Sequence, residues 1–222
     1  MLIQKRGQNT VTSIYNELRR AIANGELAEG TQLKQAAIGE QFGVSKIPVR
    51  EALMMLEADG FITQTAGKGA TVMGLSAAEA LEIYLIRMSL EPILLKDSVP
   101  NLSPLDLARA DAILHTIDSM ENLESQQWQM LDREFHHILY QAAPHERMKK
   151  LVSTMHDNLA RYYTIYKTAG PDFRIKSDQE HHEILDACKK NDLDTACEIL
   201  QQQMERSSSV LQKILKEKEK VG

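Results

Sequence analysis

Apolar residues recur at helical spacing along most of the chain, and the most regular repeat lies in residues 44–56. Four of them follow an i, i+3, i+4, i+7 pattern, namely Val49, Ala52, Leu53 and Leu56. This spacing predicts a helix that buries one face, with Ser45 as its N-cap and Pro48 in its first turn. Toward solvent the helix presents Ser45, Lys46 and Arg50, which suit phosphate groups and the edge of guanine. An ordinary amphipathic helix with solvated charges has the same pattern, so both interpretations stay open for this stretch alone.

Shorter patterns on either side of this helix predict two more helices and two strands. These elements lie at residues 10–24, 33–41, 61–65 and 70–73. Two short helices joined by a glycine-containing turn are typical of a helix-turn-helix. The turn at residues 66–69 carries a lysine and joins the two strands into a hairpin, which makes a wing. Residues 8–74 are therefore predicted to form a winged helix-turn-helix domain.

The remainder of the chain has helical periodicity almost throughout, with breaks at proline, glycine and asparagine turns. The six expected helices lie near residues 76–97, 103–122, 124–142, 145–167, 173–189 and 192–218. Antiparallel helices joined by short turns form a bundle. The predicted fold class is mostly α: an N-terminal winged helix-turn-helix, then an all-helical antiparallel bundle of six helices over residues 76–218.

The charge of the chain is uneven. The net charge is -5, but residues 1–75 hold eight lysines and arginines against seven acidic residues. The first part is therefore +1 and the remainder −6. DNA affinity would depend on a few well-placed cations and on dimerisation rather than on a bulk field. No apolar run approaches the roughly 20 residues of a membrane span. With two cysteines and no signal-peptide pattern, we expect a cytoplasmic protein with reduced thiols.

Several polar side chains are predicted on the inner faces of the bundle. Asp132 and His136 are spaced i, i+4 on one helix, and His181 and Gln203 lie on the inner faces of two later helices. A carboxylate and two imidazoles can hold a divalent metal, but they can also form a self-satisfied polar cluster. Arg87, on the first bundle helix, needs a carboxylate from the protein or from a small-molecule acid. Arg161 is a second candidate for such an acid, and its alternative is a surface charge. His137 and His182 are expected to point outward, and the ordinary surface or boundary residues are His115, His145 and His156.

The first third of the chain resembles the DNA-binding domain of the GntR family of bacterial transcription regulators. The matching residues are Gly30, Leu33, Phe42 to Ser45, Pro48 to Leu53, Leu56, Gly60, Phe61 and Gly67 to Gly69. The resemblance implies operator contacts by Ser45, Lys46, Ile47, Arg50, Gly67 and Lys68. Position 46 is often arginine in the family, and position 36 is a DNA-contacting arginine in some relatives, where this chain has Lys46 and Ala36. Ile47 offers no hydrogen bond but suits a thymine methyl group.

Residues 76–215 resemble the all-helical FCD effector-binding domain of the FadR-like subfamily. The motifs are Ile86-Arg87-x-x-Leu90-Glu91, Asp132-x-x-Phe135-His136-x-x-Leu139 and Glu180-His181-x-x-Ile184-Leu185. Many FCD domains bind a divalent metal through one aspartate and three histidines, so the resemblance implies zinc, nickel or manganese held by Asp132, His136 and His181. The fourth position is Gln203, a poor zinc ligand. Arg87 and Gln203 are the expected contacts of a small carboxylate effector.

Together these features predict a homodimeric, ligand-responsive transcription regulator that is not an enzyme. A dimer would place two recognition helices about 34 Å apart on a double-stranded DNA operator. An effector would bias the connection at residues 73–76 through a coupling on the order of 1–3 kcal/mol. Two alternatives remain open: a DNA-binding protein whose bundle only dimerises, or a hydrolase whose metal activates water.

Overall fold

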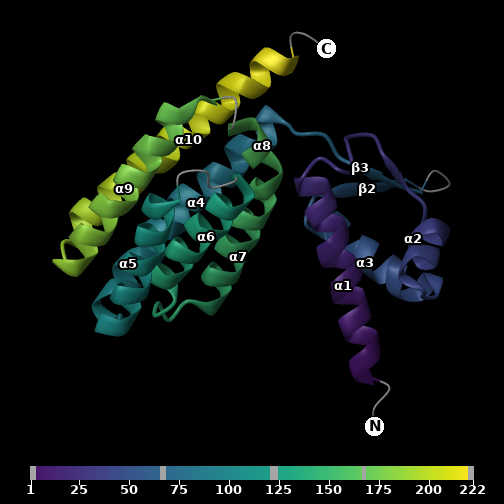
Figure 1. The fold of residues 1–222 in the computed structure, drawn as a ribbon, viewed down its shortest axis with the longest axis horizontal. Coiled ribbons are helices and arrows are strands. Elements are labelled where there is room, and N and C mark those ends of the chain that lie inside the picture. The colour runs from purple at the N-terminus through teal and green to yellow at the C-terminus, as the bar shows by residue number, and fades with distance from the viewer. Residues whose placement is uncertain (1–3, 66–68, 121–124, 167–168, 220–222) are drawn as a thin grey trace. The chain divides into compact units, whose positions relative to one another are not determined.

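A computed structural model of the chain divides between Leu75 and Ser76 into two compact units. The structure describes residues 4–65, 69–120, 125–166 and 169–219 (Figure 1). The N-terminal unit combines helices with a small sheet, and the C-terminal unit is helical, which confirms the predicted fold class. No helix in the described part of the chain is both long enough and apolar enough to cross a membrane.

The N-terminal unit is a winged helix-turn-helix. Its elements are α1 (Gln4–Ala23), β1 (Gln32–Leu33), α2 (Gln35–Phe42), α3 (Lys46–Ala58), β2 (Ile62–Thr65) and β3 (Gly69–Val72). The strands form an antiparallel sheet in the order β1-β3-β2. The two-residue strand β1 was not predicted, because two residues are too short for a periodic pattern to appear. The wing residues Gly67 and Lys68 lie outside the described residues.

The turn between α2 and α3 fixes where α3 begins. Gly43 ends α2 in the left-handed region with φ 63, a conformation that favours glycine. The backbone N–H of Val44 then donates to the carbonyl of Gly39 at 2.9 Å. Ser45 occupies the predicted N-cap position of α3, but its side chain makes no capping hydrogen bond. The predicted N-cap position is therefore confirmed, and Ser45 is exposed, as predicted for the outward face of the helix start.

The core of this unit is formed by one face of each helix and the inner face of the sheet. Its fully buried members are Ile14, Val49, Ala52, Leu53, Leu56 and Phe61. All four residues of the predicted stripe on α3 have no solvent exposure. Because the buried stripe fixes the rotation of α3, the opposite face of that helix must point to solvent.

The C-terminal unit is a helical bundle. Its elements are α4 (Ala77–Ser98), η1 (Val99–Asn101), α5 (Pro104–Ser119), α6 (Ser125–Tyr140), α7 (Glu146–Leu159), η2 (Ala160–Tyr162), α8 (Tyr163–Tyr166), α9 (Pro171–Lys189) and α10 (Leu193–Glu219). Helix α4 packs against α6, α7 and α10, and α9 packs against α5 and α10. The single helix predicted over residues 145–167 is instead broken into α7, the 3-10 turn η2 and the short α8. This break turns side chains inward that a continuous helix would expose.

Candidate functional site

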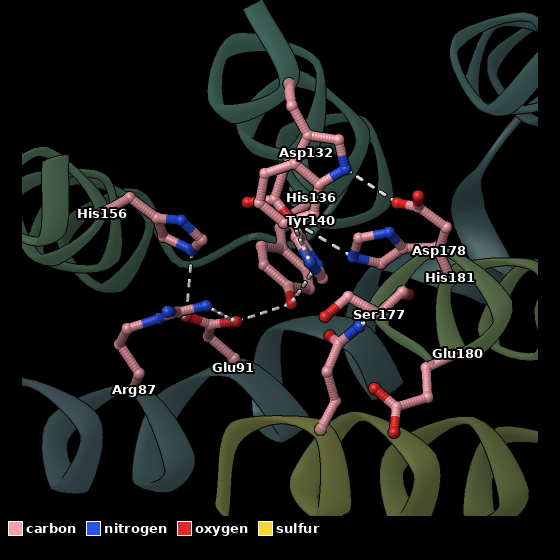
Figure 2. A network of polar contacts seen from close by, with 12 residues as sticks. Arg87, Glu91, Asp132, His136, Tyr140, His156, Ser177, Asp178, Glu180 and His181 are labelled. Atoms are coloured by element: carbon pink, nitrogen blue, oxygen red, sulfur yellow. Dashed lines mark hydrogen bonds and ion pairs between the residues drawn. The ribbon is translucent and has the colours of Figure 1, made fainter. Parts of the chain in front are cut away.

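Helices α6 and α9 bring a carboxylate and two imidazoles together in the interior of the bundle (Figure 2). Asp132, His136 and His181 are all buried. Nε2 of His181 lies 3.1 Å from Oδ1 of Asp132, and Nε2 of His136 lies 3.8 Å from the same oxygen. One potential ligand atom from each of the three residues lies within 4.8 Å of the others. The i, i+4 spacing on α6 thus produces the pair expected from the sequence, and α9 supplies the third group.

The protonation states of these groups suit a divalent cation. Burial lowers the pKa of His136 to about 3, so its imidazole is neutral at physiological pH. Burial alone would raise the pKa of Asp132, but the hydrogen bond from His181 and the neighbouring histidines outweigh it and lower this pKa below its ordinary range. Nδ1 of His181 is buried and has no hydrogen-bond partner among the described residues. One anionic carboxylate, one neutral imidazole and a second imidazole, with their ligand atoms gathered within 4.8 Å of one another, fit a divalent metal.

Gln203 on α10 is buried beside this group, but it is engaged with the backbone. Its Nε2 donates to the carbonyl oxygen of Ser177 at 3.3 Å. Both residues line a cavity of about 40 Å³. The other lining residues are Tyr84, Arg87, Trp128, Asp132, His136, Tyr166, Phe173, Met204 and Ser207. The cavity therefore contains both candidate effector residues, Arg87 and Gln203, together with two of the three candidate metal ligands.

A second polar network surrounds Glu91, which has no solvent exposure. Its carboxylate accepts hydrogen bonds from Nε of Arg87 at 2.5 Å and from the hydroxyl of Tyr140 at 2.8 Å. Nε2 of His156 lies 3.0 Å from the same carboxylate (Figure 2). Burial opposes ionisation of Glu91, but Arg87 and His156 hold its pKa well below the ordinary range. The Tyr140 hydroxyl also lies 3.3 Å from Nδ1 of His136, so this network is continuous with the candidate metal ligands.

Some residues do not lie where the sequence placed them. His156, expected at the surface or boundary, is 6% exposed because it follows Val152 and precedes Leu159 on the inner face of α7. Arg161 was also expected outside, but it is 3% exposed and its guanidinium lies 2.7 Å from Glu79. The cause is the 3-10 turn after α7, which rotates Arg161 into the bundle. The helical spacing of His156 was a usable signal, whereas the break that buries Arg161 has no clear signal in the sequence.

The structure agrees with the predictions for Arg87, His137 and His182. Arg87 finds its carboxylate within the protein, as Glu91, which was one of the two partners considered for it. His137 is exposed, and His182 is partly exposed and lies 3.0 Å from Asp118, so both point away from the buried group as expected.

In the N-terminal unit, the residues that the sequence singled out on α3 share its exposed face. Ser45, Lys46, Ile47 and Arg50 are all exposed, and Ile47 is 70% exposed. The opposite, buried stripe of α3 holds them in this orientation. The surface therefore offers two cations, one hydroxyl and one branched apolar side chain at the N-terminal end of a helix.

Comparisons with known proteins agree with this architecture. Residues 10–72 match the family described as bacterial regulatory proteins, gntR family, and residues 82–206 match the FCD domain. The HTH-type transcriptional regulator YdhC of Bacillus subtilis (strain 168) is 27% identical over 82% of this chain and 82% of that protein. The HTH-type transcriptional repressor RspR of Escherichia coli (strain K12) is 25% identical over 92% of this chain and 90% of that protein.

Solved structures show the same arrangement of elements. A GntR family transcriptional regulator from Pseudomonas syringae pv. tomato str. DC3000 is 30% identical, with a TM-score of 0.58 over 95% of this chain and 87% of that one. The E. coli protein McbR/YncC has a TM-score of 0.73 at 23% identity, over 91% of this chain and 96% of that one. The second similarity concerns the fold alone.

Replacing Glu91 by glutamine should destabilise the C-terminal unit by about 3 kcal/mol, because Arg87 and His156 would lose a buried counter-charge. Urea unfolding followed by the fluorescence of Trp128, the chain's one tryptophan, reports on this unit. The ionised Glu91 stabilises the fold above pH 4.5, its ordinary pKa, and this stabilisation is lost as the pH falls through the lowered folded-state pKa.

Asp194→Asn is the matched control, because Asp194 is exposed and pairs with exposed Lys96 at 2.8 Å. This control should leave the unfolding curve nearly unchanged. Equal unfolding curves for Glu91→Gln and the unmodified protein would contradict a stabilising role for the network.

Proposed function

The chain belongs to the GntR family of bacterial regulatory proteins and carries an FCD domain, and from this premise we propose how it works as a DNA-binding transcription regulator. Its family and relatives are transcription regulators rather than enzymes. We propose that a homodimer binds a pseudo-palindromic operator through α3, and that the FCD domain binds a small organic acid next to a divalent metal. The observation that carries the proposal is a buried Asp/His/His group beside an arginine-lined cavity, in a chain with an exposed recognition helix.

Operator binding would use the exposed face at the start of α3. Lys46 and Arg50 would contact phosphates and guanine acceptors, and the Ser45 hydroxyl, which makes no capping bond, can donate to a phosphate. By the family resemblance, Gly67 and Lys68 of the wing would add contacts in the minor groove. With so few cations, two half-sites must be engaged together for tight binding.

The metal would be held by Asp132, His136 and His181, with zinc, nickel and manganese as the candidate ions. Bound there, it would act as a Lewis acid that attracts a carboxylate. The amide of Gln203 replaces the imidazole that many FCD domains have at this position, and an amide is a weaker ligand for zinc. We therefore expect weaker metal binding than in a site with three histidines, completed by water or by the carboxylate of the effector.

The effector would enter the cavity that Arg87 and Gln203 line. At about 40 Å³, this cavity has room for a few water molecules rather than for an organic acid. Binding would therefore move the cavity walls. One wall residue, Tyr166, accepts or donates a hydrogen bond with Tyr84 at 2.7 Å, and nearby Tyr162 contacts the backbone of Ser76 at 3.3 Å. A rearrangement of this wall could therefore move Ser76, the first residue of the C-terminal unit.

The proposed homodimer would use the outer face of α4. The inner face of this helix packs within the bundle, while its outer face exposes three large hydrophobic residues, Leu81, Leu85 and Ile93. Exposed apolar side chains that gather on one face are typical of a protein–protein interface. A second copy of the chain is the occupant that an operator of two half-sites requires.

Arg50→Ala should weaken binding to an operator selected from random DNA duplexes about tenfold or more per half-site, because a phosphate or guanine contact is lost. An electrophoretic mobility shift assay with the full chain measures this loss. The melting temperature should stay unchanged, since Arg50 is exposed. Arg20→Ala is the control, because Arg20 is exposed on α1 and already paired with Glu17 and Glu26. No sequence-specific binding at low salt, with or without metabolites, would overturn the proposed function.

Gln203→His should strengthen zinc binding by roughly tenfold or more, because it completes a site of one carboxylate and three imidazoles. Titration of chelator-treated protein with zinc, nickel and manganese, followed by calorimetry, gives the affinities. His181→Ala should abolish the binding, whereas His137→Ala, which removes an exposed histidine from the same helix as His136, should not. Equal affinities in the unmodified protein and in His181→Ala would refute the metal assignment.

Leu85→Glu should shift the chain from dimer to monomer, because it places a charge in the apolar outer face of α4. Sedimentation velocity measures the oligomeric state. Leu105→Glu is the matched control, since Leu105 is 69% exposed at the start of α5. A dimer that survives Leu85→Glu would place the interface elsewhere.

A further inference from the structure

Ile47 is an unusual residue for the tip of a recognition helix. It is 70% exposed, and no other large hydrophobic side chain in the described part of the chain is more exposed. It occupies the second position of α3, between Lys46 and the exposed side chain of Arg50 one turn later. An isolated exposed hydrophobic residue is common on protein surfaces. This one is notable because the exposed residues near it at the start of α3, namely Ser45, Lys46, Arg50 and Glu51, all carry a charge or a hydroxyl.

The rotation of α3 places Ile47 where DNA would contact the helix. Val49, Ala52, Leu53 and Leu56 have no solvent exposure and fix the buried side. At 100° per residue, Ile47 lies nearly opposite the middle of this stripe, roughly 60° from Arg50 around the helix. A base pair contacted by Arg50 in the major groove would therefore have the side chain of Ile47 over an adjacent position.

The chemistry of the major groove leaves one group for such a side chain. Guanine, cytosine and adenine present hydrogen-bonding groups there, and only thymine presents a methyl group, at C5. An isoleucine over a hydrogen-bonding edge would desolvate that edge without replacing its bonds, which is costly. Over a thymine methyl, the same side chain removes apolar surface from water on both partners.

We propose that Ile47 is a specificity-determining residue that reads the C5 methyl group of one thymine in each operator half-site, next to the base pair contacted by Arg50. The inference rests on the proposed operator binding and makes it more specific.

The test separates the methyl group from everything else in the base pair. The operator is first selected from a pool of random duplexes with the full chain. Each thymine of the half-site is then replaced in turn by deoxyuridine, which lacks only the methyl group and keeps every hydrogen-bonding edge. At one position, we expect the affinity to fall about fourfold per half-site, the effect of losing one buried methyl group.

The matching protein variants identify the reader. Ile47→Ala should bind the thymine and deoxyuridine operators equally, because the partner of the methyl group has been removed. Met55→Ala, which shortens another exposed apolar residue at the edge of the same helix face, should keep the fourfold difference. Both substitutions are at exposed positions, and their melting temperatures check that the fold is unchanged.

The outcomes separate this inference from the proposed function. Specific binding that no deoxyuridine substitution weakens would overturn the inference and leave operator binding intact. A deoxyuridine effect that persists in Ile47→Ala would overturn it too, because another residue would then read the methyl group. A selection that yields no preferred sequence would instead overturn the proposed function.

Discussion

The stability of the C-terminal unit depends on the carboxylate of Glu91, which has no solvent exposure. A buried charge destabilises a fold unless opposite charges and hydrogen bonds surround it. Glu91 of α4 meets this requirement with Arg87 one turn away, Tyr140 from α6 and His156 from α7. Each of the last two contacts fixes another helix against α4. Because the hydroxyl of Tyr140 also lies beside Nδ1 of His136, the orientation of a candidate metal ligand is tied to the same buried charge.

Because of this contact, the polar residues inside the bundle form one continuous network rather than two separate sites. One end is the Asp132, His136 and His181 group, and the other is the ion pair of Glu91 with Arg87. The cavity lies against both ends. An acid bound there would lie near the guanidinium of Arg87, which already pairs with Glu91, and near a bound metal. Metal and acid would therefore each favour the binding of the other. Thermodynamic linkage requires this coupling to be reciprocal. The amide of Gln203 would increase this dependence, since a metal bound there would have fewer strong ligands.

Part of the fold and of the candidate site could be predicted from the spacing of residues along the sequence. The i, i+4 pair on α6 and the buried stripe of α3 are properties of single helices, and helical periodicity is enough to find them. Contacts between helices are different. That Glu91 would face His156 across the bundle depends on how α4 and α7 pack, which periodicity does not specify. The burial of Arg161 depends on a smaller feature, the 3-10 turn that replaces one helical turn after α7. The strand β1 is defined only by its pairing with β3.

The weak charge of the N-terminal unit determines how regulation can work. Residues 1–75 carry a net charge of +1. With few cations to contact phosphates, counterion release and the binding energy of each half-site would be modest. Tight binding then requires two linked units, and the second contact is strong only if the dimer presents it at the right spacing. In such a system an effector needs to change the free energy by only about 1–3 kcal/mol to change operator occupancy several-fold. A strongly basic unit would stay bound despite the same change. The scarcity of cations, which at first argues against DNA binding, therefore suits the proposed reversal of DNA binding by a small molecule.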